Sequence, residues 1–350
     1  MRIVVNDIAV DAGGGMSILR QFYQYIRSSG DTNEWYFLLG DRYIEPAGNI
    51  HVITLPRVKA SRPYRLWFDF VTGRKVINDL APDVVFYLQN TLVHGITSPQ
   101  VMYMDQSIPL QEEKKFSFLK PEERPYAVYQ YLIGALVRSA CKRSDRVIVQ
   151  TQWLKDAIIR RCGVAGDRIL KVYPDCNMDR QLLGSSRQVD PCCFFYPASD
   201  AVYKNHACLY EAIKLLSRQP KVFLTLSPET AVNGCTYIGK ISLEEVYCYM
   251  RSSVLVFPSY IESFGLPLLE ARKIGTLILA ADTAFAREVL SGYANAYFFS
   301  PFDPAELAEL MESVMDGRIR HIPSPETCTQ DSGSGWARVI SILEEAAKNE

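Results

Sequence analysis

Short apolar runs alternate with helix-like segments along most of this 350-residue chain, and this alternation constrains its fold more than any other feature. Such runs between helices are typical of parallel strands that are buried on both faces. In the first half of the chain they predict a doubly wound α/β domain. Its predicted strands are 2–6, 35–39, 51–55, 83–88, 101–104 and 146–150, and its predicted helices are 17–27 and 153–161.

The same pattern begins again after a polar stretch at 184–190, which predicts a second α/β domain. We expect domains at 1–185 and 190–330, and a C-terminal segment 331–350 whose helix, 335–348, could return to the first domain. Ligands of open α/β sheets bind beyond the carboxyl ends of the strands, so two such Rossmann-like domains facing each other would bind ligand in a cleft. The predicted strands here are 193–197, 222–226, 254–258 and 277–281, and the helices are 206–216, 242–250, 266–274 and 304–315.

Composition narrows the class of protein. The net charge is −1, so the basic footprint of a nucleic-acid-binding protein is missing. Nine cysteines are scattered without a Cys-x-x-Cys pair or a metal-ligand spacing, which indicates free thiols in a reducing compartment. We therefore expect an ordinary globular protein that does not bind nucleic acid.

No part of the sequence predicts a membrane-spanning helix. Residues 1–7 have the character of a buried strand rather than a signal peptide, and no stretch approaches the roughly 18 apolar residues of a span. The nearest candidate, 126–137, is interrupted by Gln130 and is expected to be a buried helix. These features favour a cytoplasmic protein, or one that sits on the inner face of the cytoplasmic membrane without crossing it.

The most informative segment is 254–271, in which a strand, a short loop and a helix follow one another. Pro267 suits the first helical turn, and Gly265 would let an anionic group approach the backbone closely. Amide groups at such a helix start form an anion site that the helix dipole strengthens. With Glu262 before the helix and Glu270 one turn inside it, the segment suits a diphosphate flanked by two sugars. The alternative is an amphipathic helix with two glutamates that face solvent.

Glu262-Ser-Phe-Gly-Leu-Pro-Leu-Leu-Glu270-Ala resembles the signature of the retaining nucleotide-sugar glycosyltransferases of family 4, which have the GT-B fold. The resemblance covers most of the second half of the chain. Supporting segments are Ala198–His206 with its Lys-Asn pair, Tyr237–Ile241, Arg287–Val289, Tyr297–Pro304, Val147–Lys155 and the glycines at 13–15.

The resemblance implies roles for individual residues. It gives Lys204 the donor diphosphate, Glu270 the ribose hydroxyls and Glu262 the transferred sugar, so that Glu262 is a candidate catalytic residue. Gly14 and Gly15 could cradle phosphate, or could form only a tight turn between a strand and a helix. The further implied donor contacts are the amides of Phe264, Gly265 and Leu266, and Ile241 in the loop beneath the nucleotide base.

The expected chemistry needs no metal ion and no cofactor beyond the nucleotide-diphosphate sugar. A lysine and a helix N-terminus stabilise the departing nucleoside diphosphate, and a carboxylate favours the oxocarbenium-like charge on the sugar. The sequence contains no Asp-x-Asp, the motif that would hold a divalent cation on the diphosphate. Resemblance to the family implies retention of anomeric configuration and a glycan or lipid-linked acceptor. By family analogy, the setting is bacterial surface polysaccharide such as lipopolysaccharide O-antigen, capsule or exopolysaccharide.

The sequence departs from the family pattern at two places. Ala198 stands where many members have an arginine, so the diphosphate has one expected cation fewer. Met104 and Asp105 stand where a histidine near the transferred sugar is expected. Asp105 is a second candidate catalytic residue, or else a structural turn residue. Among the histidines, His94 could reach the site or could simply be solvated, and His206 could support the lysine loop.

One further stretch, 57–75, combines basic and aromatic residues with a single acid, Asp69. It suits an anionic lipid surface or a lipid-diphosphate acceptor, which would make the protein a peripheral membrane protein. The alternative is a solvated basic face over an aromatic core side. Two other functions stay open for the chain as a whole: a non-catalytic donor-binding subunit, and another sugar-nucleotide enzyme of the same fold, such as an epimerase. Donor sugar, base, acceptor and linkage depend on pocket shape rather than on any motif.

Overall fold

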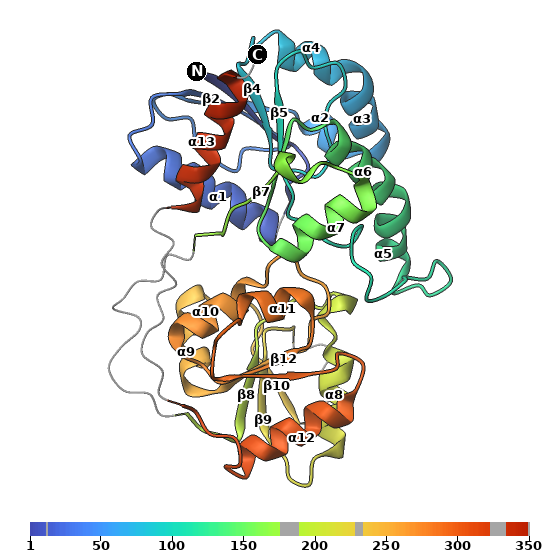
Figure 1. Ribbon diagram of the computed structural model, residues 1–350, viewed down its shortest axis with the longest axis vertical. Helices are drawn as coiled ribbons and strands as arrows, with labels where there is room; N and C mark the ends of the chain where they lie inside the picture. The colour runs from blue at the N-terminus through green and yellow to red at the C-terminus, as the bar shows by residue number, and fades with distance from the viewer. Residues whose placement is uncertain (12, 176–188, 228–233, 323–333, 349–350) are drawn as a thin grey trace. The chain divides into compact units, whose positions relative to one another are not determined.

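The computed structural model describes residues 1–11, 13–175, 189–227, 234–322 and 334–348 (Figure 1). The chain forms two compact units, one made of Met1–Asp175 together with Asp331–Glu350, the other of Cys176–Gln330. The polar stretch at which we placed the predicted domain boundary lies largely outside the described residues. Each unit is an α/β layer structure built on its own sheet.

The first unit contains a seven-stranded parallel sheet in the order β3-β2-β1-β4-β5-β6-β7. Alternate residues of β1 enter two different cores, Val4 on one face and Ile3 and Val5 on the other, so the sheet is buried on both sides. The sequence predicted every strand except the short β7. The strands are β1 Arg2–Asp7, β2 Glu34–Leu39, β3 Ile50–Thr54, β4 Val84–Tyr87, β5 Gln100–Tyr103, β6 Arg146–Val149 and β7 Ile169–Lys171.

Helices cover both faces of this sheet. One face is covered by α1 (Gly13–Ser28) and by α13 (Gly335–Lys348), whose Trp336 ring lies 4.9 Å from Phe22 and 5.7 Å from Tyr103. The opposite core takes residues from two long bent helical segments and from α7. Those elements are α2 Pro56–Ala60, α3 Arg62–Trp67, η1 Phe68–Thr72, α4 Gly73–Asn78, α5 Arg124–Val128, η2 Tyr129–Ile133, α6 Gly134–Arg143, α7 Gln152–Cys162 and the short η3 Gly166–Arg168.

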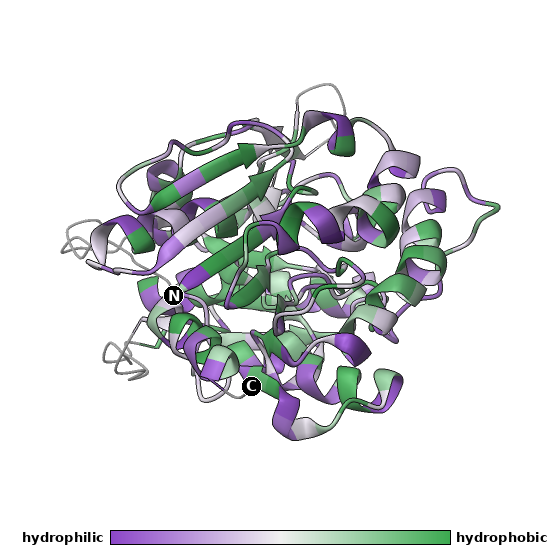
Figure 2. Ribbon diagram, turned by 90° about the horizontal axis from the view of Figure 1, so that it is seen from above, coloured by the Kyte–Doolittle hydropathy of each residue, from purple (hydrophilic) through white to green (hydrophobic). Residues whose placement is uncertain are grey.

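Both bent segments contain a π-helical turn, η1 and η2, a rare geometry that widens the helix by one residue. The helix predicted at 126–137 therefore forms as α5, η2 and the start of α6. The prediction that it is buried is wrong for Tyr131 and Leu132, which are 40% and 63% exposed. Seen from above, hydrophilic and hydrophobic residues alternate along the helices, as expected for helices buried on one side (Figure 2).

The second unit contains a six-stranded parallel sheet in the order β10-β9-β8-β11-β12-β13. Ser242 starts α9 with a capping box, and Gly275 ends α10 in the left-handed conformation, so both helix ends follow from local sequence. The elements are β8 Cys193–Tyr196, η5 Val202–Lys204, α8 His206–Leu215, β9 Lys221–Leu224, β10 Cys235–Tyr237, α9 Leu243–Ser252, β11 Val254–Phe257, α10 Leu266–Ile274, β12 Ile278–Ala281, α11 Ala284–Val289, β13 Ala296–Phe299 and α12 Pro304–Met315.

Each sheet has one point where the strand order changes direction, between β1 and β4 in the first unit and between β8 and β11 in the second. At such a point the loops after the two strands separate and leave room for a ligand. Within the described ranges, no helix is long and apolar enough to cross a membrane. The seven cysteines that the structure describes are free thiols, as the sequence predicted for them.

Candidate functional site

Lys204 and Glu262 meet at the point between β8 and β11. Lys204 ends the loop after β8, and Glu262 lies in the loop after β11. The lysine Nζ is 2.5 Å from the glutamate Oε1, and their side chains are only 18% and 15% exposed. Ser259 donates a hydrogen bond to the same Oε1 at 2.8 Å. The residues predicted for the diphosphate and for the sugar are thus an ion pair in the free protein.

Side-chain hydrogen bonds fix the loop that carries Lys204. Asn205 adopts the left-handed conformation at φ 60°, and its Nδ2 donates to the carbonyls of Pro258 at 3.1 Å and Pro301 at 2.7 Å. The Tyr196 hydroxyl donates to the Lys204 carbonyl at 2.8 Å. Loops after three strands are therefore tied together, so the lysine is held in place by the sheet.

The N-terminus of α10 follows Glu262 directly. Gly265 has φ 86°, and a Cβ there would lie 3.3 Å from Leu268 Cδ1, so both the backbone conformation and the packing favour glycine. Phe264 is buried beside it, and no side chain caps the first turn, which begins at Leu266 as predicted. The positive end of the helix dipole therefore lies at the same edge of the sheet as the Lys204–Glu262 ion pair.

Glu270 lies one turn further along α10. Burial raises its pKa to about 7, although the Tyr247 hydroxyl and the Lys273 ammonium act in the opposite direction. The Tyr247 hydroxyl, on α9, is 3.4 Å from the carboxylate Oε1. Near neutral pH this group therefore exchanges between a carboxylate that accepts the hydrogen bond from Tyr247 and a neutral acid. Ile241, the predicted base contact, is half-buried in the loop that joins β10 to α9.

The expected arginine of the family pattern has no direct replacement at its own position. The Ala198 carbonyl accepts a hydrogen bond from the Thr225 hydroxyl at 3.2 Å, which closes that loop. Arg287, on the helix next to α10, is engaged by Asp282 through two contacts of 2.7 Å and lies 3.7 Å from the Phe298 ring centre. In the free protein this arginine is therefore already paired with Asp282.

The first unit brings Asp105 next to the glycines of α1. Asn90 Nδ2 donates to the Asp105 Oδ1 at 2.7 Å, and a Cβ on Gly15 would lie 3.9 Å from Oδ2. Burial raises the Asp105 pKa, and the hydrogen bond from Asn90 lowers it. Gly14 and Gly15 belong to the first turn of α1 rather than to a loop before it. Asp105 and the glycines thus lie together at the carboxyl edge of the first sheet.

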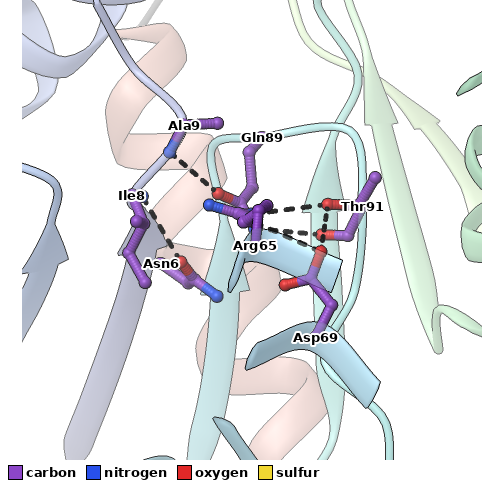
Figure 3. Close-up of polar contacts among 7 residues, drawn as sticks. All are labelled: Asn6, Ile8, Ala9, Arg65, Asp69, Gln89 and Thr91. Atoms are coloured by element: carbon purple, nitrogen blue, oxygen red, sulfur yellow. Dashed lines mark hydrogen bonds and ion pairs between the residues drawn. The ribbon is translucent and has the colours of Figure 1, made fainter. Parts of the chain in front are cut away.

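A polar cluster that sequence reasoning missed lies behind this edge (Figure 3). The Arg65 Nε is 3.2 Å from Asp69 Oδ2, which also accepts from the Thr91 hydroxyl at 3.2 Å, and Gln89 Oε1 accepts from the Ala9 amide at 3.3 Å. Asp7, which closes β1, is 3% exposed. Burial raises its pKa well above the usual range, Asp105 raises it further, and Arg65 lowers it. An acid directly after the apolar run of a buried strand was the available signal in the sequence.

The two histidines that the sequence offered as site residues, His94 and His206, each pack against an aromatic ring. The His94 ring stacks on Phe70 at 4.3 Å on the outer helical layer, and burial lowers its pKa. The His206 ring is buried 5.0 Å from the Tyr196 ring, and burial lowers its pKa to about 4, so it is neutral near pH 7 and supports the lysine loop. Among the residues that the structure describes, no three His, Cys, Asp or Glu side chains cluster closely enough to hold a metal ion.

Part of the chain is similar in sequence to known proteins. Residues 229–330 match the family described as Glycosyl transferases group 1. D-inositol 3-phosphate glycosyltransferase of Streptomyces avermitilis is 25% identical over 208 residues, 49% of this chain and 45% of the relative, so the match spans less than half of that protein. O-antigen chain mannosyltransferase B of Escherichia coli is 23% identical over 279 residues, 72% of this chain and 69% of the relative.

Solved structures share the fold over nearly the whole chain. WaaG, a glycosyltransferase involved in lipopolysaccharide biosynthesis, superimposes with a TM-score of 0.68 at 15% identity over 97% of this chain and 99% of its own. Anabaena HepE in complex with UDP-glucose gives a TM-score of 0.63 at 16% identity over 99% and 98%. The predicted fold class, two parallel-sheet α/β domains of the GT-B type, is confirmed.

Proposed function

We propose that this protein transfers a sugar from a nucleotide-diphosphate donor to a glycan or lipid-linked acceptor, because residues 229–330 match the family Glycosyl transferases group 1 and the chain has the GT-B fold. The reaction retains the anomeric configuration and needs no metal ion. The observation that carries the proposal is the Lys204–Glu262 ion pair at the β8/β11 switch point, beside the N-terminus of α10.

The ion pair is the resting state of the donor site. An arriving diphosphate brings negative charge to Lys204 and to the amide end of α10, and this charge competes with Glu262 for the lysine. Glu262 then becomes available to the sugar, where a carboxylate stabilises positive charge that develops at the anomeric carbon. Lysine and helix dipole together stabilise the leaving nucleoside diphosphate, which is the role a divalent cation has in metal-dependent transferases.

Glu270 and Asp105 have separate roles in the proposal. Glu270, backed by Tyr247, accepts hydrogen bonds from the ribose hydroxyls of the donor. Asp105, oriented by Asn90, contacts the transferred sugar from the first unit, where the family pattern has a histidine. No side chain acts as a covalent nucleophile, and the acceptor attacks on the face from which the diphosphate leaves.

The biological setting proposed is bacterial surface polysaccharide, on the cytoplasmic side of the membrane. Support comes from two similar proteins, an O-antigen chain mannosyltransferase and a glycosyltransferase involved in lipopolysaccharide biosynthesis. Shared fold alone does not fix substrate, so this part of the proposal rests on analogy.

The test uses purified protein with UDP-glucose, UDP-galactose and GDP-mannose in EDTA, measuring binding by calorimetry and nucleoside diphosphate release by a coupled assay. We expect one donor to bind and to be hydrolysed slowly, and Lys204→Ala to weaken its binding. Lys214→Ala, on an exposed lysine paired with Glu211, is the matched control. Donor binding without any release would favour the non-catalytic subunit, and release that requires added metal would overturn metal independence.

A further inference from the structure

The helical segment from α3 to α4 exposes an unusual run of large apolar side chains. Within the eight positions 64–71, five large apolar side chains are exposed: Tyr64 (61%), Leu66 (45%), Trp67 (56%), Phe70 (46%) and Val71 (37%). Large apolar residues gathered in this way mark an interaction site rather than ordinary surface. We call these five side chains the outer strip.

The inward side of the same segment explains why the outer strip cannot turn into the core. Phe68 is 2% exposed, and Asp69 is held by Arg65 and Thr91 in the cluster of Figure 3. A Cβ on Gly73 would lie 2.9 Å from Val93 Cγ1, so the helix lies directly against the loop after β4. With this side fixed, the outer strip faces away from the sheet.

Exposed basic residues flank the outer strip on both sides along the chain. Arg57, Arg62, Arg74 and Lys75 are all exposed, whereas Asp69, the acid within the segment, is buried against Arg65. Lys75 pairs with Asp79 at 2.9 Å, which leaves an excess of three arginines around the strip. The structure thus separates the stretch that the sequence singled out. Arg65, Phe68 and Asp69 point inward, and the outward part carries apolar and basic side chains but no exposed acid.

We infer that the outer strip and its arginines bind the surface of an anionic lipid bilayer. Tryptophan and tyrosine prefer the boundary between acyl chains and headgroups, where their rings are apolar and their polar atoms are wet. Basic side chains near an anionic leaflet each contribute about 1 kcal/mol of attraction. An anionic surface fits this part of the protein because the exposed ionised side chains of segment 57–75 are all basic, while its one acid, Asp69, is buried.

A second exposed group lies on η2 of the other bent segment and in the loop that precedes this segment. Leu119 is 90% exposed and Leu132 63%, and the rings of Phe118 and Tyr131 lie 5.7 Å apart. Both bent segments contribute to the core on the same face of the first sheet, so both expose apolar residues from one layer of helices. Charges near this second group are mixed in sign, so the inference rests on the outer strip.

The test measures co-sedimentation of the full chain with vesicles of phosphatidylcholine alone or of phosphatidylcholine with one-quarter phosphatidylglycerol. We expect binding to the anionic vesicles, weakening as salt rises. Replacing Arg57, Arg62 and Arg74 by glutamine should weaken it about a hundredfold, since each charge counts for about 1 kcal/mol. The matched control replaces Lys214, Arg218 and Lys221, exposed cations of the second unit, and should leave binding unchanged.

The apolar part is tested separately. Trp67→Ser with Phe70→Ser should abolish vesicle binding, and Leu215→Ser with Phe302→Ser, at 59% and 55% exposure in the second unit, should not. Trp67→Phe should keep binding but lose most of the blue shift in tryptophan fluorescence. All these variants should retain donor hydrolysis, so this inference and the proposed function can fail independently. Equal binding to both vesicle types, or strip variants that change only self-association in ultracentrifugation, would overturn the inference.

Discussion

The raised pKa of Glu270 should make donor binding depend on pH near neutrality. Only the ionised carboxylate accepts hydrogen bonds from both ribose hydroxyls, and burial places its pKa at about 7. With that value, about a tenth of the groups are ionised at pH 6 and about nine tenths at pH 8. If the donor binds only the ionised form, its affinity should rise about tenfold between pH 6 and pH 8, or about 1.4 kcal/mol.

The assay is isothermal titration calorimetry with a UDP-sugar or GDP-sugar that binds. An intact nucleotide sugar is preferable to a free nucleoside diphosphate, because its diphosphate does not titrate in this range. Titration at pH 7 in two buffers of different ionisation enthalpy should reveal release of about half a proton per donor bound. Glu270→Gln should bind more weakly at pH 8 and should lose the pH dependence.

The raised pKa of Glu270 also affects stability. As pH rises, donor affinity should increase while the free energy of unfolding decreases. A glutamate whose pKa is raised on folding retains its proton in the folded state, so the free energy of unfolding falls as pH rises from about 4.5 to about 7. Glu270→Gln should therefore stabilise the protein at pH 8, by about 3 kcal/mol at most, and not at pH 4. A flat affinity profile in the native protein, or a profile that survives in the glutamine variant, would refute the role of this carboxylate.

Three further outcomes are expected. Glu262→Gln should lower turnover at least a hundredfold. Free nucleoside diphosphate should bind this variant as well as before or better, because Lys204 loses its intramolecular partner. Weaker diphosphate binding in calorimetry would contradict the resting ion pair. Gly265→Ala should lower stability by about 1–2 kcal/mol and also weaken donor binding. The control is Gly292→Ala, at φ 72° with open space around it, which should lower stability alone. A thermal-shift assay with and without donor measures both effects. Arg65→Met should destabilise the protein by about 3 kcal/mol in urea unfolding, because it leaves a buried carboxylate without its cation; a loss below about 0.5 kcal/mol would show that this pair contributes little.

Local sequence determined much of the second unit. The start of α10 at Leu266 follows from the glycine before it and the proline after it, and α12 begins and ends where its cap and apolar spacing place it. By contrast, β10 is a three-residue strand with partly exposed side chains, so it lacks the apolar run that marks the other strands. Of the two bent segments, the sequence predicted a helix at 126–137, but it did not predict the continuation of that helix to Arg143 or the π-helical turns in the two segments.

The sequence predicted which residues form the candidate site, but it did not predict which of them interact with each other. Motif spacing placed Lys204 and Glu262 in one site, but a salt bridge between residues 58 positions apart depends on how β8 and β11 pair. The raised pKa of Glu270 depends on burial by α9, which no local pattern reports. The cluster of Asp7, Arg65 and Asp69 joins two elements distant in sequence and therefore became visible only in the folded chain.

Helix α13 affects the order in which the chain can fold during synthesis. Trp336, Val339 and Leu343 complete a core whose other members, such as Phe22 and Trp35, belong to the earliest part of the chain. On the ribosome this helix emerges only after the whole second unit, so the second unit can fold while one face of the first sheet still lacks its cover. A nascent chain should therefore pass through a state with an exposed aromatic surface, in which it depends on chaperones until its last segment arrives.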